Sequence, residues 1–93
     1  MELKNDYNEK NGTFYLQENG KREAEMPYVF AGPAKFIIDH TEVFSGNEGK
    51  GLGKQLVKAA VDFAREKSIK ILPLCPYVKS VMEKTPEYAD VVS

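Results

Sequence analysis

The chain has 93 residues, of which 42% are hydrophobic and 29% charged, a composition typical of a globular protein with one small core. Thirteen basic side chains balance fourteen acidic ones, and this near-neutral charge argues against general binding to nucleic acid or to a membrane surface. A single cysteine and a single histidine exclude an intramolecular disulfide and a Cys/His zinc cage.

The first third of the chain predicts β-structure. Residues 12–17 are a strand-like run, and the turn that follows has Asn19-Gly20 at its centre, which is typical of a β-hairpin. Hydrophobic and polar residues then alternate over residues 22–31, where Pro27 predicts a bulge or a sheet edge. A further strand is expected over residues 34–43, so that the strands form an antiparallel meander.

The second half of the chain predicts alternating helices and strands. Hydrophobic residues recur at helical spacing over residues 51–67, followed by a short apolar strand at 69–74 and a second helix at 76–84. A strand, a helix and a returning strand normally form a parallel pair. We therefore expect a single α+β domain over residues 1–93, in which the meander leads into a β-α-β-α unit that is α/β-like.

Parallel strands bring their carboxyl ends to one edge of a sheet. Residues 40–43, the loop at 46–53 and Cys75 are therefore expected to lie near one another, although they are far apart in the sequence. Ligands of open α/β sheets usually bind at such an edge.

The loop before the first helix is rich in glycine, with Gly46, Gly49, Gly51 and Gly53 preceding or opening the helix. Glycine costs a helix about 0.5–1 kcal/mol relative to alanine, so this density needs a reason. Backbone N–H groups at a helix N-terminus bind anions, and a phosphate can approach closely where no Cβ stands in the way. Lys50 and Lys54 would add positive charge. The alternative is a flexible strand-to-helix connection that holds no ligand.

Two common phosphate motifs do not fit this loop. The Rossmann spacing fails because Lys54 stands where the third glycine belongs, and the Walker A pattern fails because Gln55 follows Gly53-Lys54. Residues 48–53, Glu-Gly-Lys-Gly-Leu-Gly, resemble the Gln/Arg-x-x-Gly-x-Gly/Ala pyrophosphate signature of the GNAT superfamily of N-acetyltransferases. The sequence departs from that signature at Glu48, where the family usually has Gln or Arg.

A wider resemblance covers roughly residues 12–92. Beside the glycine helix it is carried by Ile38-Asp39-His40-Thr41-Glu42-Val43, Ala64-Arg65, Pro73-Leu74-Cys75-Pro76-Tyr77-Val78 and Pro86-Glu87-Tyr88. These segments resemble a short, single-domain subgroup of GNAT-like proteins that keeps the acetyl-CoA half of the fold. The resemblance implies that two parallel strands splay apart, and that Val43 and Thr41 contact the pantetheine arm there. It implies that the pyrophosphate is held by Glu48, Gly49, Lys50, Gly51, Leu52, Gly53 and Lys54.

Cys75 is a candidate catalytic residue. It follows an apolar strand and precedes Pro76, and proline is favoured at the first position of a helix. Its sulfur is therefore expected near a helix N-terminus, where a thiolate is stabilised. Exchange of a thioester from CoA to a cysteine is nearly isoenergetic, so an acetyl-cysteine intermediate is chemically reasonable. The alternative is a buried, inert cysteine.

Two further side chains are candidates for proton transfer. His40 could act as a general base because imidazole exchanges protons near neutral pH; the alternative is a hydrogen-bonded structural histidine. Tyr77 could protonate the CoA thiolate, as tyrosines do in many GNAT enzymes, although its position differs from the usual one and packing in the second helix is the alternative. Lys79 is a candidate for an additional phosphate contact.

The sequence thus predicts a small N-acetyltransferase that moves an acetyl group from acetyl-CoA to an amine or thiol acceptor, with no metal. A non-catalytic acyl-CoA-binding module and an interaction domain remain as alternatives. The N-terminus lacks the pattern of a secretory signal and no apolar run approaches the roughly 20 residues of a membrane span, so we expect a cytoplasmic protein with no membrane partner. Exposed edge strands make a homodimer a further expectation.

Overall fold

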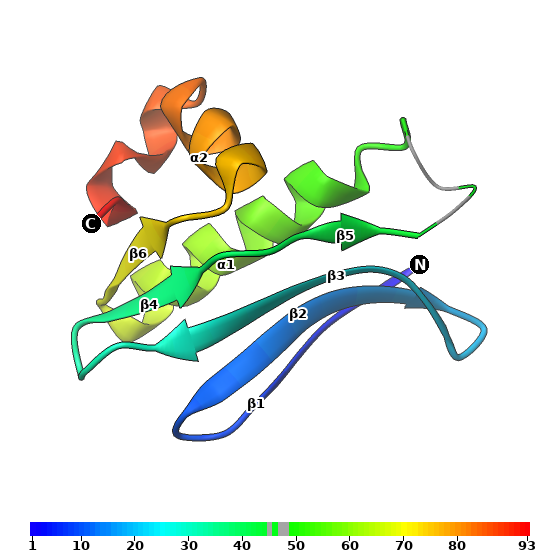
Figure 1. Cartoon of the computed structure of the whole chain (residues 1–93), viewed down its shortest axis with the longest axis horizontal. Coiled ribbons are helices and arrows are strands. Elements are labelled where there is room, and N and C mark those ends of the chain that lie inside the picture. The colour runs from blue at the N-terminus through cyan, green and yellow to red at the C-terminus, as the bar shows by residue number, and fades with distance from the viewer. Residues whose placement is uncertain (45, 47–48) are drawn as a thin grey trace.

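A computed structural model describes residues 1–44, 46 and 49–93. The elements in chain order are β1 (Glu2–Tyr7), β2 (Asn11–Glu18), β3 (Lys21–Phe30), β4 (Lys35–Ile38), β5 (Glu42–Val43), α1 (Leu52–Lys67), β6 (Lys70–Pro73), α2 (Pro76–Glu83) and the 3₁₀-helix η1 (Pro86–Val91). The sheet has the order β1-β2-β3-β4-β6, and β5 pairs with β3 beyond the end of β4 (Figure 1). Only β4 and β6 are parallel among the described pairs, which confirms the predicted α+β fold.

Strand β1 is the element that the hydrophobic pattern did not predict. It pairs with β2 along its whole length, from Glu2 opposite Gln17 to Tyr7 opposite Gly12. Its large apolar side chains, Leu3 and Tyr7, are both exposed. The strand is held by backbone hydrogen bonds and by edge contacts of the Tyr7 ring with Phe30 and Phe63, and neither leaves a periodic pattern of buried hydrophobic residues.

The predicted hairpin turn between β2 and β3 is confirmed. Asn19 and Gly20 have positive φ values of 52° and 78°, the combination that a type I′ turn requires. The predicted bulge at Pro27 is wrong, because the register shifts between Leu16 and Gln17 instead, while Pro27 lies opposite Thr13 in regular pairing.

Pro27 nevertheless lies at a position where β3 has no paired strand on one side. The N–H of Phe30 donates to the Lys10 carbonyl on the β2 side, so alternation along β3 directs the nitrogen of Pro27 to the opposite side. There, β3 pairs with β4 only from Tyr28 onward and with β5 only at Ala24 and Glu25. The missing N–H of the proline therefore faces a gap in the ladder.

The strand predicted over residues 34–43 is divided into β4 and β5, and one carbonyl explains the division. The N–H groups of Leu74 and Cys75 both donate to the Ile38 carbonyl, each over 2.9 Å. Parallel pairing of β4 with β6 ends at this point. The chain then leaves β6 and returns to β3, where Val43 lies opposite Ala24. The predicted splay of the parallel pair begins here (Figure 1).

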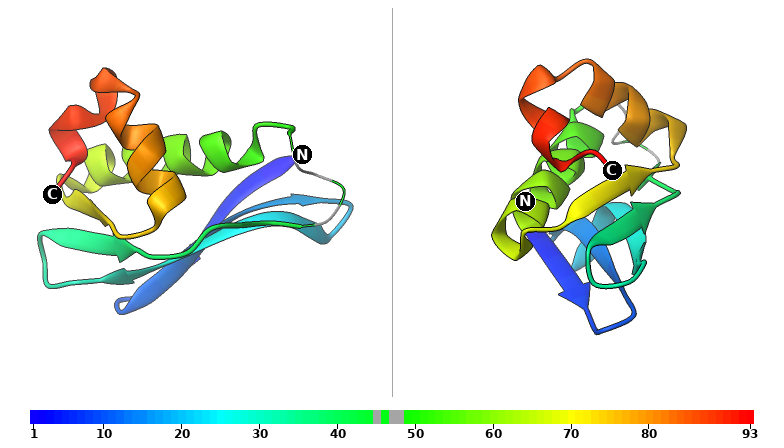
Figure 2. Two further views of the ribbon diagram at one scale, coloured as in Figure 1. Left: turned by 45° about the horizontal axis from the view of Figure 1, so that its top comes forward. Right: turned by 90° about the vertical axis from the view of Figure 1, so that its left-hand side faces the viewer.

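The core lies between the sheet and α1, and both α-helices cover the same face of the sheet (Figure 2). Arg65 of α1 binds the Asp90 carboxylate through two nitrogens, over 2.8 and 3.1 Å, and so holds η1 against the helix. The opposite sheet face has no helix among the described residues and presents half-exposed side chains such as Tyr15, Pro27 and Ile37.

Tyr28 makes the stability of the fold sensitive to pH in the alkaline range. Its hydroxyl donates to the Asn5 side chain over 2.7 Å, and burial raises its pKa to about 12, above the value near 10 of an exposed tyrosine. The contribution of this neutral hydroxyl is complete below pH 10 and is lost as the pH rises towards about 12.

Tyr28→Phe should flatten the fall in unfolding free energy over this range, as measured by denaturant titration at several pH values. An equally steep fall in the variant would contradict the assignment.

Candidate functional site

The split between β5 and β6 has Cys75 at its base. Cys75 is the N-cap of α2 and is 5% exposed. Its sulfur lies 3.6 Å from the hydroxyl oxygen of Thr41, on the strand segment that diverges. The two predicted residues are thus brought together from positions 34 residues apart.

The described part of the glycine loop has a backbone that only glycine adopts readily. Gly49 and Gly51 have φ values of 83° and 75°, and a Cβ on either would meet no other atom within 4 Å. Glycine is therefore favoured at both positions because the backbone is left-handed there, and not because neighbouring atoms leave no room for a side chain. Gly51 caps α1 without a side-chain hydrogen bond, and the first turn of the helix carries no acidic residue. The dipole at the N-terminus of α1 therefore meets no acidic side chain within the first turn of the helix, and it favours an anion there.

A cavity of about 430 Å³ lies beside the start of α1. It is lined by Val43, Gly49, Gly51, Leu52, Gly53, Lys54 and Tyr77. Each of these residues was a candidate from the sequence, and they come from β5, the loop, α1 and α2. Of the other candidates, Lys50 is exposed on the same loop, and Glu48 lies outside the described residues.

The ring of Tyr77 rests on Gly53. A Cβ added to Gly53 would lie 2.7 Å from both the hydroxyl oxygen and a ring carbon of Tyr77, closer than real contacts allow. The missing side chain of Gly53 therefore makes room for the tyrosine ring, and not for a phosphate group. Burial, followed by the nearby Cys75, raises the pKa of Tyr77. The phenol accordingly stays protonated at neutral pH and can donate a proton.

His40 lies apart from the cavity lining. Its side chain is exposed, and its Nε2 is 3.5 Å from a carboxylate oxygen of Glu42. Although His40 precedes Thr41 in the sequence, its side chain faces solvent and the Glu42 carboxylate.

A second cavity, of about 340 Å³, lies on the other side of Tyr77 between α1 and α2. It is lined by Lys54, Tyr77, Ser80, Val81, Lys84, Thr85 and Tyr88. Sequence reasoning missed its α2 side, although residues 77, 80, 81 and 84 have the spacing of one helix face. Lys79, the proposed extra phosphate contact, lines a different cavity between β6 and α2.

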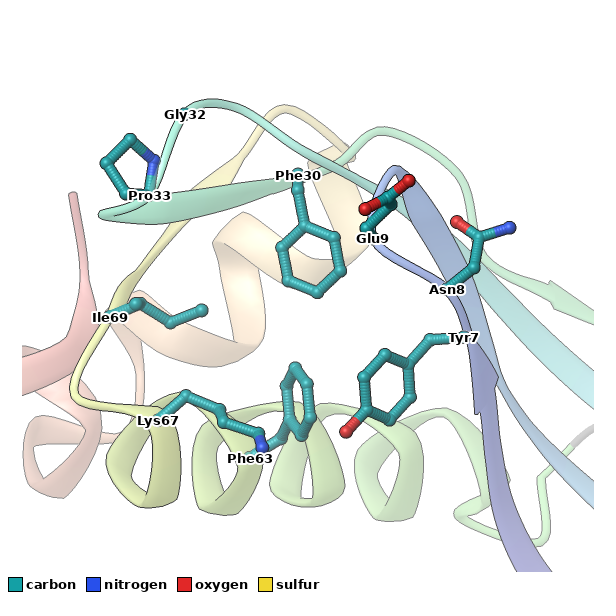
Figure 3. A pocket seen from close by; sticks show the side chains of 9 residues that line it. All are labelled: Tyr7, Asn8, Glu9, Phe30, Gly32, Pro33, Phe63, Lys67 and Ile69. Carbon is teal, nitrogen blue, oxygen red and sulfur yellow. The ribbon is translucent and has the colours of Figure 1, made fainter.

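Another cavity, at the opposite end of α1, contains none of the candidate residues. Its volume is about 370 Å³, and Figure 3 shows the rings of Tyr7, Phe30 and Phe63 grouped around it, with Lys67 beside them. The described residues contain no group of three or more His, Cys, Asp or Glu side chains that could hold a metal ion. No helix among them is long and apolar enough to cross a membrane.

Comparison with known proteins gives a consistent result. The sequence profile of a family described as GCN5-related N-acetyl-transferase matches residues 13–91. Protein NATD1 from Xenopus tropicalis is 30% identical over 82 residues, which make up 87% of this chain and 75% of that protein. Similarity at this level extends over most of both sequences.

Solved structures share the fold. A GCN5-like protein from Staphylococcus aureus, solved by NMR as a candidate N-acetyltransferase, aligns with a TM-score of 0.74 and 36% identity, over 98% of this chain and 88% of that one. AAC(6')-Iy, in complex with the bisubstrate analog CoA-S-monomethyl-acetylneamine, aligns with a TM-score of 0.59 over 92% of this chain and 64% of that one. Its 12% identity shows the shared fold alone.

The contact between Gly53 and Tyr77 predicts a coupled pair of substitutions. Gly53→Ala should displace the tyrosine ring at a cost of less than about 1 kcal/mol, because the overlapping atoms are the far end of a partly exposed side chain. In a Tyr77→Ala background the same change should stabilise by about 0.5–1 kcal/mol, the usual helix preference for alanine. Denaturant unfolding of the four proteins in this double-mutant cycle measures the coupling. Equal effects of Gly53→Ala in both backgrounds would contradict the contact.

Proposed function

Because this chain belongs to the GCN5-related N-acetyl-transferase family, we propose that it binds acetyl-CoA and transfers the acetyl group to an amine or thiol acceptor. The observation that carries the proposal is the cavity formed by Val43, the glycine loop and Tyr77, with Cys75 at the base of the adjoining split. This arrangement supports an anion site at the helix N-terminus with a cysteine nearby in the fold.

The residues present fit the substrate. The left-handed backbone at Gly49 and Gly51 and the start of α1, which has a glycine N-cap and no acidic residue in its first turn, suit a pyrophosphate. Lys54 adds positive charge at the cavity wall. Strand β5 pairs with β3 on one side only among the described residues. Its other side faces the split, where the backbone of Val43 could pair with the amide groups of the pantetheine arm. The bisubstrate complex of AAC(6')-Iy supports CoA as a ligand of this fold.

We further propose that Cys75 accepts the acetyl group. Its thiolate sulfur would attack the thioester carbonyl carbon; the carbon–sulfur bond to Cys75 forms, and the bond to the CoA sulfur breaks. An acceptor amine would then attack the same carbon, releasing the Cys75 thiolate and losing a proton. The position of the sulfur at the N-terminus of α2, in contact with the Thr41 hydroxyl, supports this role.

Tyr77 and His40 are the proposed proton-transfer groups. Tyr77 is protonated at neutral pH, as an ordinary tyrosine is, and burial raises its pKa further, so it can protonate the departing CoA thiolate. His40 is exposed, and so could take a proton from an acceptor arriving from solvent.

A non-catalytic acyl-CoA-binding module is the second candidate function. The observation that favours it is the bare sheet face, where no helix of the described chain provides walls for an acceptor. A chain of this kind would bind acetyl-CoA without turnover.

Binding is tested by calorimetry with CoA on two matched glycine variants. Gly51→Ala and Gly32→Ala introduce the same backbone strain, since their φ values are 75° and 73° and neither Cβ meets another atom. Only Gly51 lines the proposed site. Gly51→Ala should weaken CoA binding by about tenfold, while Gly32→Ala should leave it unchanged. Absence of CoA binding to the wild-type chain would reject the function and favour an interaction domain.

Catalysis is tested by mass spectrometry after incubation with acetyl-CoA and no acceptor. The wild-type chain should gain one acetyl group, and Cys75→Ala should remain unmodified. Release of CoA in the presence of amines should fall at least about a hundredfold in Cys75→Ala. Turnover by Cys75→Ala at the wild-type rate would instead indicate direct transfer, and binding without any turnover would favour the module.

A further inference from the structure

We propose that the free edge of β1 pairs with β1 of a second copy of this chain. The two strands run antiparallel with Asn5 at their centre, opposite Asn5 of the second copy, so that one continuous sheet extends through both chains. This inference is independent of the proposed acetyl transfer, because β1 contributes no residue to the cavity at the glycine loop. It gives a surface and a register to the homodimer that the exposed edge strands led us to expect.

The sheet has two outer strands, and β1 is the one with a free edge among the described residues (Figure 1). The outer edge of β6 is occupied, because Val92 forms a parallel bridge with Ile71 and the N–H of Ser93 donates to the Ile71 carbonyl over 2.7 Å. Two residues further along β6, Pro73 faces the same side and has no N–H to donate. A new strand is therefore expected at β1, which pairs with β2 alone within the described chain.

Alternation along β1 decides which backbone groups face outward. The N–H of Asn8 donates to the Asn11 carbonyl over 2.9 Å, which makes these two residues a hydrogen-bonded pair of the β1–β2 hairpin. The register is regular along β1, so hydrogen-bonded and non-hydrogen-bonded pairs alternate from there. The backbone groups that point away from β2 are therefore those of Leu3, Asn5 and Tyr7. In the proposed register each of these residues exchanges hydrogen bonds with a residue of the second copy.

Side chains on the sheet face opposite the helices are complementary in this register. Lys4 lies opposite Asp6 of the second copy, and the two-fold symmetry repeats the pair on the other side of the centre. The Lys4 side chain is 46% exposed, and its nitrogen is 4.0 Å from a carboxylate oxygen of Glu2, a weak ion pair. The Asp6 carboxylate has no ion pair or hydrogen bond with a described residue. Both charges are thus available for a contact between chains.

Neighbouring registers are less favourable. Centring the pair on Lys4 would place this lysine opposite itself and Glu2 opposite Asp6, so that like charges meet. Centring it on Leu3 would leave Asp6 and Tyr7 beyond the end of β1 of the second copy. Of these registers, only the proposed one pairs opposite charges and includes both large apolar side chains of the strand.

On the face that the helices cover, the same register brings apolar side chains together. The Asn5 side chain accepts the Tyr28 hydroxyl, so alternation places Leu3 and Tyr7 on this face as well. They are 49% and 46% exposed in the single chain, and each lies opposite the other residue in the second copy. The Tyr7 ring already rests against Phe63 of α1, so it loses little conformational freedom when it is covered. The pairing thus accounts for apolar side chains left half exposed on an edge strand.

Sedimentation velocity over chain concentrations from about 5 to 500 µM tests the dimer. One strand from each chain makes a small contact, so the expected dissociation constant is about 10–100 µM. Lys4→Asp and Asp6→Lys should each weaken the dimer at least about tenfold, because each places like charges opposite one another on both sides of the centre. The double variant Lys4→Asp/Asp6→Lys restores opposite charges and should return to within about threefold of wild type. The matched control, Lys35→Asp, makes the same change of charge on the same sheet face in β4 and should dimerise as wild type does.

A second measurement uses the wild-type chain alone. Amide hydrogen exchange at Leu3, Asn5 and Tyr7 should slow as the chain concentration rises through the dissociation constant, because their N–H groups become paired. The Lys4 amide, which faces β2, is the internal control and should change much less.

Any one of four results would overturn the proposal. They are a wild-type chain that stays monomeric at about 500 µM, a dimer that neither single variant weakens, a double variant that is no stronger than the single ones, and exchange at the three amides that does not depend on concentration. Calorimetry with CoA reports separately on the proposed function, so failure of the dimer would leave that function untouched.

Discussion

The arrangement of the candidate site depends on one backbone acceptor, the carbonyl of Ile38. It accepts the N–H groups of both Leu74 and Cys75, and with that the parallel pairing of β4 and β6 ends. Two strands that separate inside a sheet leave unpaired backbone groups on both sides. Here β5 pairs with β3 along its far edge and leaves its other edge facing the split, and α2 begins across the split at Cys75. The split, the cysteine at its base and the start of α2 therefore have a common origin.

Much of the fold followed from hydrophobic periodicity and turn chemistry, and the exceptions have physical causes. Asn19-Gly20 and the apolar stripe of α1 placed a hairpin and a helix close to their observed limits. Strand β1 was not predicted because its two large apolar side chains, Leu3 and Tyr7, stay about half exposed, so its pattern resembles that of a loop. The division of one predicted strand into β4 and β5 could not be foreseen, because it depends on the shared Ile38 carbonyl and on a gap in the ladder beside Pro27. Periodicity reports burial, not hydrogen-bond partners.

The candidate site was predictable where a motif is local, and less so where it depends on the packing of helices. Every residue that lines the first cavity belongs to the loop signature, to β5 or to the start of α2, and was a candidate from the sequence. The second cavity was missed because it needs the relative position of α1 and α2, which no spacing encodes. Gly53 was expected to let a phosphate approach the backbone, but its neighbour is the ring of Tyr77. The roles of Cys75 and His40 stay predictions.

The seating of Tyr77 on Gly53 has a consequence for the evolution of such chains. Position 53 is constrained by the side chain at position 77, and not only by a ligand. Relatives with a small residue at the equivalent of Tyr77 can carry alanine at the equivalent of Gly53 without any rearrangement, whereas an aromatic ring there must first move aside. Part of the glycine signature should therefore covary with α2 across homologues, so that a motif usually attributed to cofactor recognition also records helix packing.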